Sequence, residues 1–172
     1  MTAETEMATA AKMSPMALAT AIIELASKQN IVIVLAESCT GGLIASALTD
    51  IPGSSAVVDR GLVTYSNEAK IDLLGISNET LVAYGAVSAE TAIAMTAGVL
   101  AATPRATLAA SVTGIAGPGG GSPNKPVGLV HFSCQRRGKA AQHERHIFTG
   151  DRETVRNKSL LNALTMIYNE LK

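Results

Sequence analysis

The amino-acid sequence predicts an α/β fold built on a mixed sheet. Short apolar segments typical of strands alternate with segments of helical periodicity, which is the pattern of α/β proteins. Near the C-terminus, strand-like segments at 127–134 and 140–148 flank the turn-like stretch Gln135–Lys139 and predict an antiparallel hairpin. With 172 residues, the chain is long enough for one domain with a substantial core.

The first half of the chain contains two expected helices and two expected strands. Residues 1–14 show no sustained period, so we expect a flexible tail there and a single domain over 15–172. Ser14-Pro15 is typical of a helix start, and 51–55 contains the proline and glycine that interrupt a helix. The expected elements are a helix over 15–28, a strand over 31–35, a helix over 40–49 and a strand over 56–65.

Capping residues predict the helices of the second half. Serine, asparagine and aspartate side chains accept hydrogen bonds from the free N–H groups at a helix start, and glycine commonly ends a helix. Such residues predict a helix from Ser66 or Asn67 to Gly75, one from Asn78 to Gly85, one from Ser88 to near Pro104, and a last helix after Asp151. An apolar strand over 106–112 precedes the hairpin.

Composition and charge exclude several classes of protein. The chain has 14 basic and 14 acidic side chains and no basic block, so we expect it to bind neither nucleic acid nor a membrane. No apolar run approaches the roughly 18 residues that cross a bilayer, and the acidic start is unlike a secretory signal, which predicts a cytoplasmic protein. The core must be aliphatic, because 47% of residues are apolar and only 3% aromatic. We expect a homo-oligomer that covers part of this apolar surface.

Cysteine and histidine are too sparse to indicate a metal centre. Cys39 and Cys134 are expected to remain free thiols in a reducing compartment. His131, His143 and His146 all fall on the predicted hairpin, where His143 and His146 would point to opposite faces of a strand. No metal-binding motif is present, so we expect neither a metal ion nor a cofactor.

A reactive elbow is predicted where the strand over 31–35 leads into the next helix. There Ser38, Cys39 and Thr40 precede two glycines, which places hydroxyl and thiol groups beside the free N–H groups of a helix start. On one interpretation, Ser38 or Thr40 caps the helix. On another, Ser38 or Cys39 is a nucleophile, and a nucleophilic serine requires a base.

Lys70 is the candidate base. Tyr65 stands at the end of the strand over 56–65, and Lys70 follows about one helical turn into the next element, so both side chains can face one cleft. A lysine that acts as a base has to be desolvated, so that its pKa falls from about 10.4 toward neutrality. The alternative is that Lys70 is an ordinary solvated surface residue.

A second unusual segment, rich in glycine, spans 114–125. It contains neither the P-loop motif nor the dinucleotide-binding fingerprint. The glycines either allow a sharp chain return or present the N–H groups of Gly117–Gly121 to an anion such as a phosphate, with Lys125 adding charge. Arg145, Arg152 and Arg156 are further phosphate candidates, although charged residues at a helix start are commonly just solvated.

Three segments of the chain together match one protein family. They are 36–42 (Ala-Glu-Ser-Cys-Thr-Gly-Gly), 63–70 (Val-Thr-Tyr-Ser-Asn-Glu-Ala-Lys) followed by Gly85–Ser88, and 112–120 (Val-Thr-Gly-Ile-Ala-Gly-Pro-Gly-Gly), and the match continues at 125–128 and 150–152. In this order they closely resemble the C-terminal domain of the competence/damage-inducible protein CinA, over about residues 15 to 171. The resemblance implies a three-layer α/β/α sandwich with a mixed, mostly parallel sheet.

The resemblance also implies an activity. Such domains include bacterial nicotinamide-nucleotide amidohydrolases of the PncC kind, which convert nicotinamide mononucleotide and water into nicotinic acid mononucleotide and ammonia. We therefore expect Ser38 to attack the carboxamide, Lys70 to take the serine proton, and Tyr65 to relay or orient it. N–H groups at the start of the helix at residue 40 are expected to face the oxyanion. The expected substrate-binding residues are Thr40, Gly41, Gly42, Thr113, Gly114, Gly117, Gly119, Gly120, Lys125 and Arg145.

A second hypothesis belongs to a different class. The chain would be a non-catalytic nucleotide-binding or interaction module that serves competence or DNA-damage responses. The simultaneous presence of Ser38, Tyr65 and Lys70 favours the enzyme, because a binding module requires only the loops.

Overall fold

The structure is a computed structural model that describes residues 13–172. The tail expected over 1–14 lies outside the described residues except for its last two. Five strands form one sheet in the order β2-β1-β3-β4-β5. The strands are β1 (Ile33–Glu37), β2 (Val58–Val63), β3 (Leu108–Gly114), β4 (Leu129–Arg136) and β5 (Gln142–Ile147).

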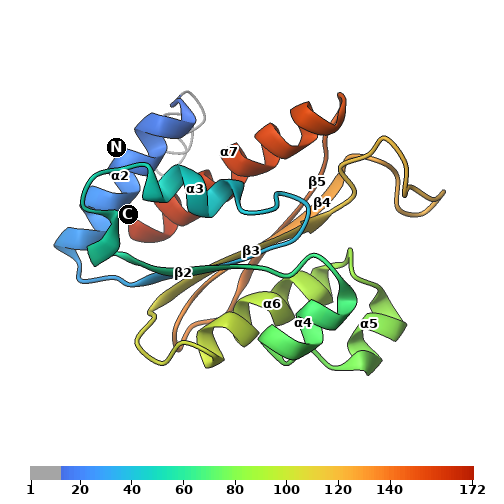
Figure 1. Cartoon of the computed structure of the whole chain (residues 1–172), viewed down its shortest axis with the longest axis horizontal. Coiled ribbons are helices and arrows are strands. Elements are labelled where there is room, and N and C mark those ends of the chain that lie inside the picture. Colours follow the sequence, from blue (N-terminus) through green and yellow to red (C-terminus); the bar gives the residue numbers. More distant parts are fainter. Residues whose placement is uncertain (1–12) are drawn as a thin grey trace.

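Helices cover both faces of the sheet, as expected for a three-layer sandwich. They are α2 (Pro15–Lys28), α3 (Leu43–Thr49), α4 (Asn67–Leu74), α5 (Asn78–Tyr84), α6 (Ala89–Ala101), α7 (Arg152–Leu171) and the short 3-10 helix η1 (Ser54–Ala56). Figure 1 shows α2, α3 and α7 on one face and α4, α5 and α6 on the other. No helix within residues 13–172 combines the length and apolar character needed to cross a membrane.

The sheet is mixed, but the expectation that it is mostly parallel is wrong. Strand β1 pairs in parallel with β2 and with β3, whereas β3–β4 and β4–β5 are antiparallel. The C-terminal hairpin is the reason: β4 pairs antiparallel to β3 as well as to β5, so the parallel pairings make up only half of the ladders.

Alternating side chains of the central strand divide the interior into two cores. Ile33 and Leu35 of β1 pack with α2, α3 and α7, while Val34 and Ala36 pack with α4 and α6. Continuing the alternation, Glu37 points toward α3, where its carboxylate is bonded. The next side chain therefore faces the α4 side of the sheet.

Most of the expected helix caps are confirmed. The side chains of Ser66, Ser88 and Asp151 accept hydrogen bonds from N–H groups in the first turns of α4, α6 and α7. The expected cap of α5 is one residue off, because Ser77 and not Asn78 accepts the bond. Both residue types are good caps, and the sequence does not show which of two neighbours has the extended backbone that a cap requires.

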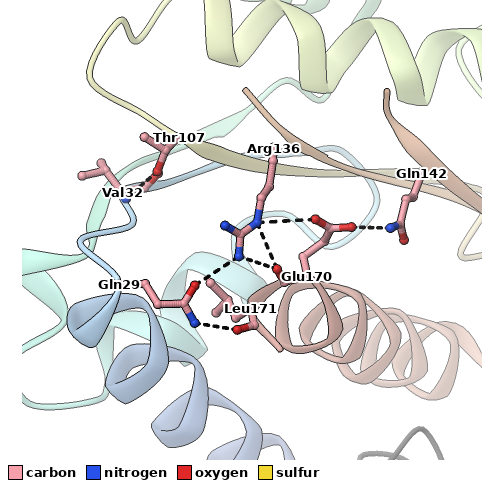
Figure 2. A network of polar contacts seen from close by, with 7 residues as sticks. All are labelled: Gln29, Val32, Thr107, Arg136, Gln142, Glu170 and Leu171. Atoms are coloured by element: carbon pink, nitrogen blue, oxygen red, sulfur yellow. Dashed lines mark hydrogen bonds and ion pairs between the residues drawn. The ribbon is translucent and has the colours of Figure 1, made fainter. Parts of the chain in front are cut away.

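A polar network fastens the end of the sheet at which β4 finishes (Figure 2). The Arg136 guanidinium donates to the Glu170 carbonyl through Nε at 3.0 Å and to the Gln29 side chain at 3.2 Å. Gln29 donates in turn to the Leu171 carbonyl at 2.6 Å, and the Glu170 carboxylate bonds Gln142. These contacts tie α2, the end of α7 and the hairpin together.

Candidate active site

Three parallel strands end at the same edge of the sheet, and the chain leaves each of them with a polar residue. Ser38 follows β1, Thr64 and Tyr65 follow β2, and Thr113 lies at the end of β3. Backbone bonds hold these ends together: Ser38 N–H donates to Val112 O at 3.0 Å, and Thr64 N–H donates to Glu37 O at 2.8 Å. The carboxyl edge of a parallel sheet is where α/β proteins commonly bind ligands.

Ser38 and Lys70, 32 residues apart, meet at this edge. Lys70 Nζ donates a hydrogen bond to Ser38 Oγ at 3.2 Å. The serine faces the α4 side because of the strand alternation, and Lys70 lies in the first turns of α4. The two side chains that the sequence named as nucleophile and base are therefore in direct contact.

Lys70 is a buried amine without an acidic partner. Its residue is only 1% exposed, and its other hydrogen bonds go to backbone carbonyls, to Thr64 O at 2.7 Å and to Ser66 O at 3.5 Å. None of the ion pairs within residues 13–172 involves it. Burial lowers the pKa of Lys70 below the usual 10.5, because the charged ammonium is poorly solvated there. The alternative of a solvated surface lysine is therefore wrong.

Glu37, to which the sequence analysis assigned no role, caps the helix after the elbow. Its carboxylate accepts bonds from Thr40 Oγ1 at 2.7 Å, Gly42 N at 2.9 Å and Ala45 N at 2.8 Å. Helix α3 begins at Leu43 with Gly42 as its N-cap, so Ser38 and Thr40 do not cap it. The interpretation of Ser38 as a helix cap is therefore wrong.

The helix start that was expected to face the oxyanion is also largely occupied by Glu37. Glu37 accepts from the N–H groups of Gly42, Ile44 and Ala45, and Gly41 N–H donates to Ser38 O at 3.0 Å. Within the described part of the chain, no other residue accepts from the N–H groups of Cys39, Thr40 and Leu43. Of these three residues, only Cys39 lines the cleft.

Cys39 does not have the properties of a reactive thiol. It is 6% exposed and packs in the core on the α3 side of the sheet. Burial raises its pKa to about 12, so the thiolate is negligible near pH 7. Cys134 is also buried, and both cysteines are free.

A cleft of about 280 Å³ opens beside Ser38 and Lys70. Its walls come from the ends of β1 and β3, from Ala86 and Val87 before α6, and from the glycine-rich loop after β3. Figure 1 shows this loop extending beyond the sheet between β3 and β4. The expected site residues that line the cleft are Ser38, Tyr65, Lys70, Thr113, Gly114, Gly117, Gly119 and Gly120.

Arg152 lies at the rim of this cleft together with Tyr65. The guanidinium donates to Gly117 O at 2.9 Å and to the Tyr65 hydroxyl at 3.2 Å. Tyr65 is 61% exposed, and its phenol bonds neither Ser38 nor Lys70. The structure therefore gives no support to a proton relay through Tyr65, and it adds Arg152 to the cleft.

Several expected binding residues are not brought to the cleft. Lys125 donates to Tyr84 O at 2.6 Å, at the end of α5. Arg145 is exposed on β5, and its backbone pairs with His131. Thr40, Gly41 and Gly42 form the back of the elbow, where Arg156 donates to Thr40 O at 2.8 Å. Their contribution is to hold the elbow and not to line the cavity.

None of the three histidines lines the cleft, although His131 pairs across the sheet with Thr113, which does. His131 and His143 are hydrogen bonded at 3.0 Å on one face of the hairpin, while His146 bonds Glu144 on the other, as the strand alternation predicts. Burial, followed by the neighbouring His143 charge, lowers the pKa of His131 to about 4. Residues 13–172 contain no group of three or more potential metal ligands.

Two functional residues were underestimated from sequence. The available signal for Glu37 was a lone carboxylate at the end of an otherwise apolar strand, directly before the elbow. For Arg152, the available signal was its position directly after the Asp151 cap, at the first residue of α7. Neither signal shows which loop, distant in sequence, lies within reach.

The fold and the site together define a class of protein: an α/β domain with a buried serine–lysine pair beside a cleft at the carboxyl edge of its sheet. Comparison with known sequences makes this specific. The chain belongs to the CinA C-terminal domain family, whose model matches residues 16–171.

Among curated relatives, a protein named nicotinamide-nucleotide amidohydrolase PncC from Enterobacter agglomerans is 53% identical over 135 residues, which cover 78% of this chain and 82% of the relative. A putative competence-damage inducible protein of Clostridioides difficile is 46% identical over 91% of this chain. The chain spans only about a third of that longer relative, 36% of its length.

Solved structures confirm the fold class. The crystal structure of the competence/damage-inducible protein CihA from Agrobacterium tumefaciens has a TM-score of 0.86 and 49% sequence identity, covering 90% of this chain and 96% of that chain. The competence damage-inducible protein A from Klebsiella pneumoniae has a TM-score of 0.88 at 36% identity, covering 92% and 98%.

Proposed function

We propose that this chain is a nicotinamide-nucleotide amidohydrolase, which converts nicotinamide mononucleotide and water into nicotinic acid mononucleotide and ammonia. The observation that carries the proposal is the 3.2 Å contact between Lys70 Nζ and Ser38 Oγ, two residues that line the same cleft. The 53% identity to a protein named for this activity supports the choice of substrate.

The first chemical step is attack of Ser38 on the carboxamide carbon. A neutral Lys70 amine has two N–H groups for Thr64 O and Ser66 O, which leaves its lone pair for the serine proton. The Ser38 Oγ–C bond forms as Lys70 takes that proton. Lys70 then protonates the leaving nitrogen, so that the C–N bond breaks, ammonia departs and a nicotinoyl ester remains on Ser38.

The developing oxyanion requires hydrogen-bond donors. The Cys39 amide is the candidate, because Cys39 directly follows Ser38 and lines the cleft, whereas Glu37 occupies the N–H groups of Gly42, Ile44 and Ala45. Loss of one such donor typically raises the barrier by about 3 kcal/mol. In the second step, Lys70 activates a water molecule that attacks the ester, which releases the nicotinate product and restores the serine.

The phosphate of the substrate is assigned to the mouth of the cleft. Arg152 supplies a guanidinium, and Gly119 and Gly120, whose backbone can donate to a phosphate, line the same cavity. Tyr65 holds the guanidinium in place through its hydroxyl. With the phosphate at the rim, the pyridine ring extends inward toward Ser38.

The proposal is tested by incubating the purified chain with nicotinamide mononucleotide and following ammonia. Wild type should release ammonia, and Ser38→Ala should lower kcat at least about 10³-fold, as for other nucleophilic serines. Cys39→Ala is the matched control: it removes the neighbouring thiol and should retain wild-type kcat within a few-fold. Full activity of Ser38→Ala would contradict the nucleophile assignment, and loss of activity in Cys39→Ala would indicate a thiol enzyme.

Hydroxylamine tests the acyl-enzyme directly. A nicotinoyl ester on Ser38 should react with hydroxylamine to give the hydroxamate of the nucleotide at the expense of the acid, detectable by mass spectrometry. If the mononucleotide instead raised the melting temperature with no ammonia released, the chain would be a binding module and not an enzyme, because ligand binding alone stabilises the folded state.

A further inference from the structure

The backbone around Ser38 is held by two charged side chains that the proposed chemistry does not use. Glu37 is 1% exposed, and Arg156 reaches the elbow from α7. Neither residue lines the cleft. We propose that Glu37 and Arg156 form an elbow clamp, a pair of positioning residues that hold Ser38 against Lys70 and so set the reactivity of the serine.

The Glu37 arm fixes the elbow and the start of α3 as one unit. Its Oε2 accepts from Thr40 Oγ1, Gly42 N and, at 3.2 Å, Ile44 N, while Oε1 accepts from Ala45 N at 2.8 Å. A carboxylate has about four acceptor positions on two oxygens, and four donors fill them. A glutamine amide has only one acceptor oxygen, so its NH₂ group would face a donor.

The Arg156 arm holds the same turn from helix α7. Its Nη2 donates to Thr40 O at 2.8 Å, so Thr40 is bonded through both its hydroxyl and its carbonyl. A Cβ placed on Gly41, whose φ is +62°, would lie 3.7 Å from Nη2. The guanidinium therefore packs directly on the turn.

The clamp affects the reactivity of Ser38 because the clamped residues lie on either side of it in the chain. Glu37 and Thr40 flank Ser38 and Cys39, so the clamped points bracket the nucleophile and the Cys39 amide assigned to the oxyanion. The Glu37 side chain lies on the α3 side of the sheet, and Ser38 contacts Lys70 on the α4 side. A displacement of about 1 Å between reacting groups can cost about 100-fold in rate. Loosening either arm should therefore lower kcat and leave substrate binding largely intact.

The turnover part of this inference rests on the proposed function, so the test adds a readout that does not. A fluorophosphonate phosphonylates the Oγ of activated serines, forming an O–P bond as the P–F bond breaks and fluoride leaves, whatever the natural substrate of the enzyme. Its rate of labelling at Ser38, followed by peptide mass spectrometry, reports the reactivity of the serine alone. The variants are Glu37→Gln and Arg156→Gln. Ser14→Ala, which removes the cap of the distant helix α2, is the control for a general loss of helix stability.

Both clamp variants should show slower labelling and lower kcat by about 10- to 100-fold, with KM within about 3-fold of wild type. Ser14→Ala should match wild type in all three quantities. Arg156→Lys, which retains a donor for Thr40 O, should recover most of the rate. Each measurement is made well below the melting temperature of the variant, so that only folded protein contributes.

The outcomes separate the two proposals. Wild-type labelling without ammonia release removes the amidohydrolase function and leaves the clamp standing. Wild-type labelling rates in folded Glu37→Gln and Arg156→Gln overturn the clamp, whatever the turnover. Should Glu37→Gln not fold, Arg156→Gln decides the matter, because it leaves the buried carboxylate fully bonded. A wild-type Ser38 that fails to label overturns both the nucleophile and the clamp.

Discussion

The basic side chains at the two ends of the sheet have opposite kinds of partner. Where β4 finishes, the Arg136 guanidinium bonds the Glu170 carbonyl and Gln29 and lies 3.7 Å from the Glu170 carboxylate (Figure 2). At the carboxyl edge of β1, Lys70 is more deeply buried and is met only by neutral oxygens. A cation paired with an acid holds the fold together. An unpaired, desolvated cation is costly, and the proton transfer that we propose for Lys70 is a functional reason to keep such a residue.

The largest expected effect is on activity and comes from Lys70→Met. This variant keeps an apolar chain of similar length but removes the base, so kcat should fall about 10³-fold. The free energy of unfolding should change by less than about 1 kcal/mol, because relief of the buried charge offsets the loss of a partner for Thr64 O. Ammonia release and urea unfolding measure the two quantities. A large loss of stability would show that Lys70 belongs with Arg136 as a structural cation.

Arg152→Gln should have the next largest effect. It shortens the side chain and removes the charge assigned to the phosphate, so kcat/KM for nicotinamide mononucleotide should fall about 10- to 100-fold, mainly through KM. The same variant should discriminate less between the mononucleotide and its dephosphorylated nucleoside. Competition between the two substrates gives the ratio directly. An unchanged ratio would move the phosphate site away from Arg152.

Arg136→Met tests the opposite end. Removal of the guanidinium leaves the Glu170 carbonyl and the Gln29 side chain without their donor, so the free energy of unfolding should fall by about 2 kcal/mol. The kcat of the folded enzyme should equal that of wild type, because the network lies at the far end of the sheet from Ser38. Denaturant unfolding and steady-state kinetics on one preparation provide both numbers. Reduced kcat at full folding would mean that the two ends are coupled.

The smallest expected effect is a pH dependence that separates Lys70 from Arg136. Because the folded-state pKa of Lys70 lies below 10.5, the unfolded chain binds more protons between that pKa and about 10.4. The free energy of unfolding should therefore gain a contribution from Lys70 as pH rises through this window, and Lys70→Met should lack it. Activity should rise over the same range as the amine becomes neutral. If the difference in unfolding free energy between wild type and Lys70→Met did not change with pH, the lowered pKa of Lys70 would be contradicted.

Sequence patterns located the elements well and their ends less well. The strands expected at 31–35 and 106–112 begin and end two residues later, as Ile33–Glu37 and Leu108–Gly114. Apolar composition suggested the earlier boundaries, whereas pairing with neighbouring strands continues β1 to Glu37 and β3 to Gly114. Pairing partners come from other parts of the chain, so local composition does not report them.

In the candidate site too, features set by local sequence were predicted and features set by distant contacts were not. Ser38 and Lys70 were named as candidates from residue type and position, because an elbow before two glycines and a lysine after a strand end are local features, and the resemblance to the CinA family implied their roles as nucleophile and base. The cap on α3 could not be identified in this way, because Ser38 and Thr40 were the expected caps, and only the direction of the Glu37 side chain shows that it takes this role. Lys125 and Arg145 were expected at the cleft from charge alone, and their distant partners place them elsewhere.

By itself, the sequence determined the alternation of strands and helices, the free cysteines, most helix caps and the glycine-rich loop, since each depends on nearby residues and on the periods of the two regular structures. Only the tertiary structure decided that Ser38 and Lys70 touch, that Lys70 is desolvated without an acidic partner, and that Glu37 and Arg156 close on the elbow between them. These properties depend on the packing of α4 and α7 against opposite faces of one sheet. Burial and contact between segments arise only when the whole chain has folded.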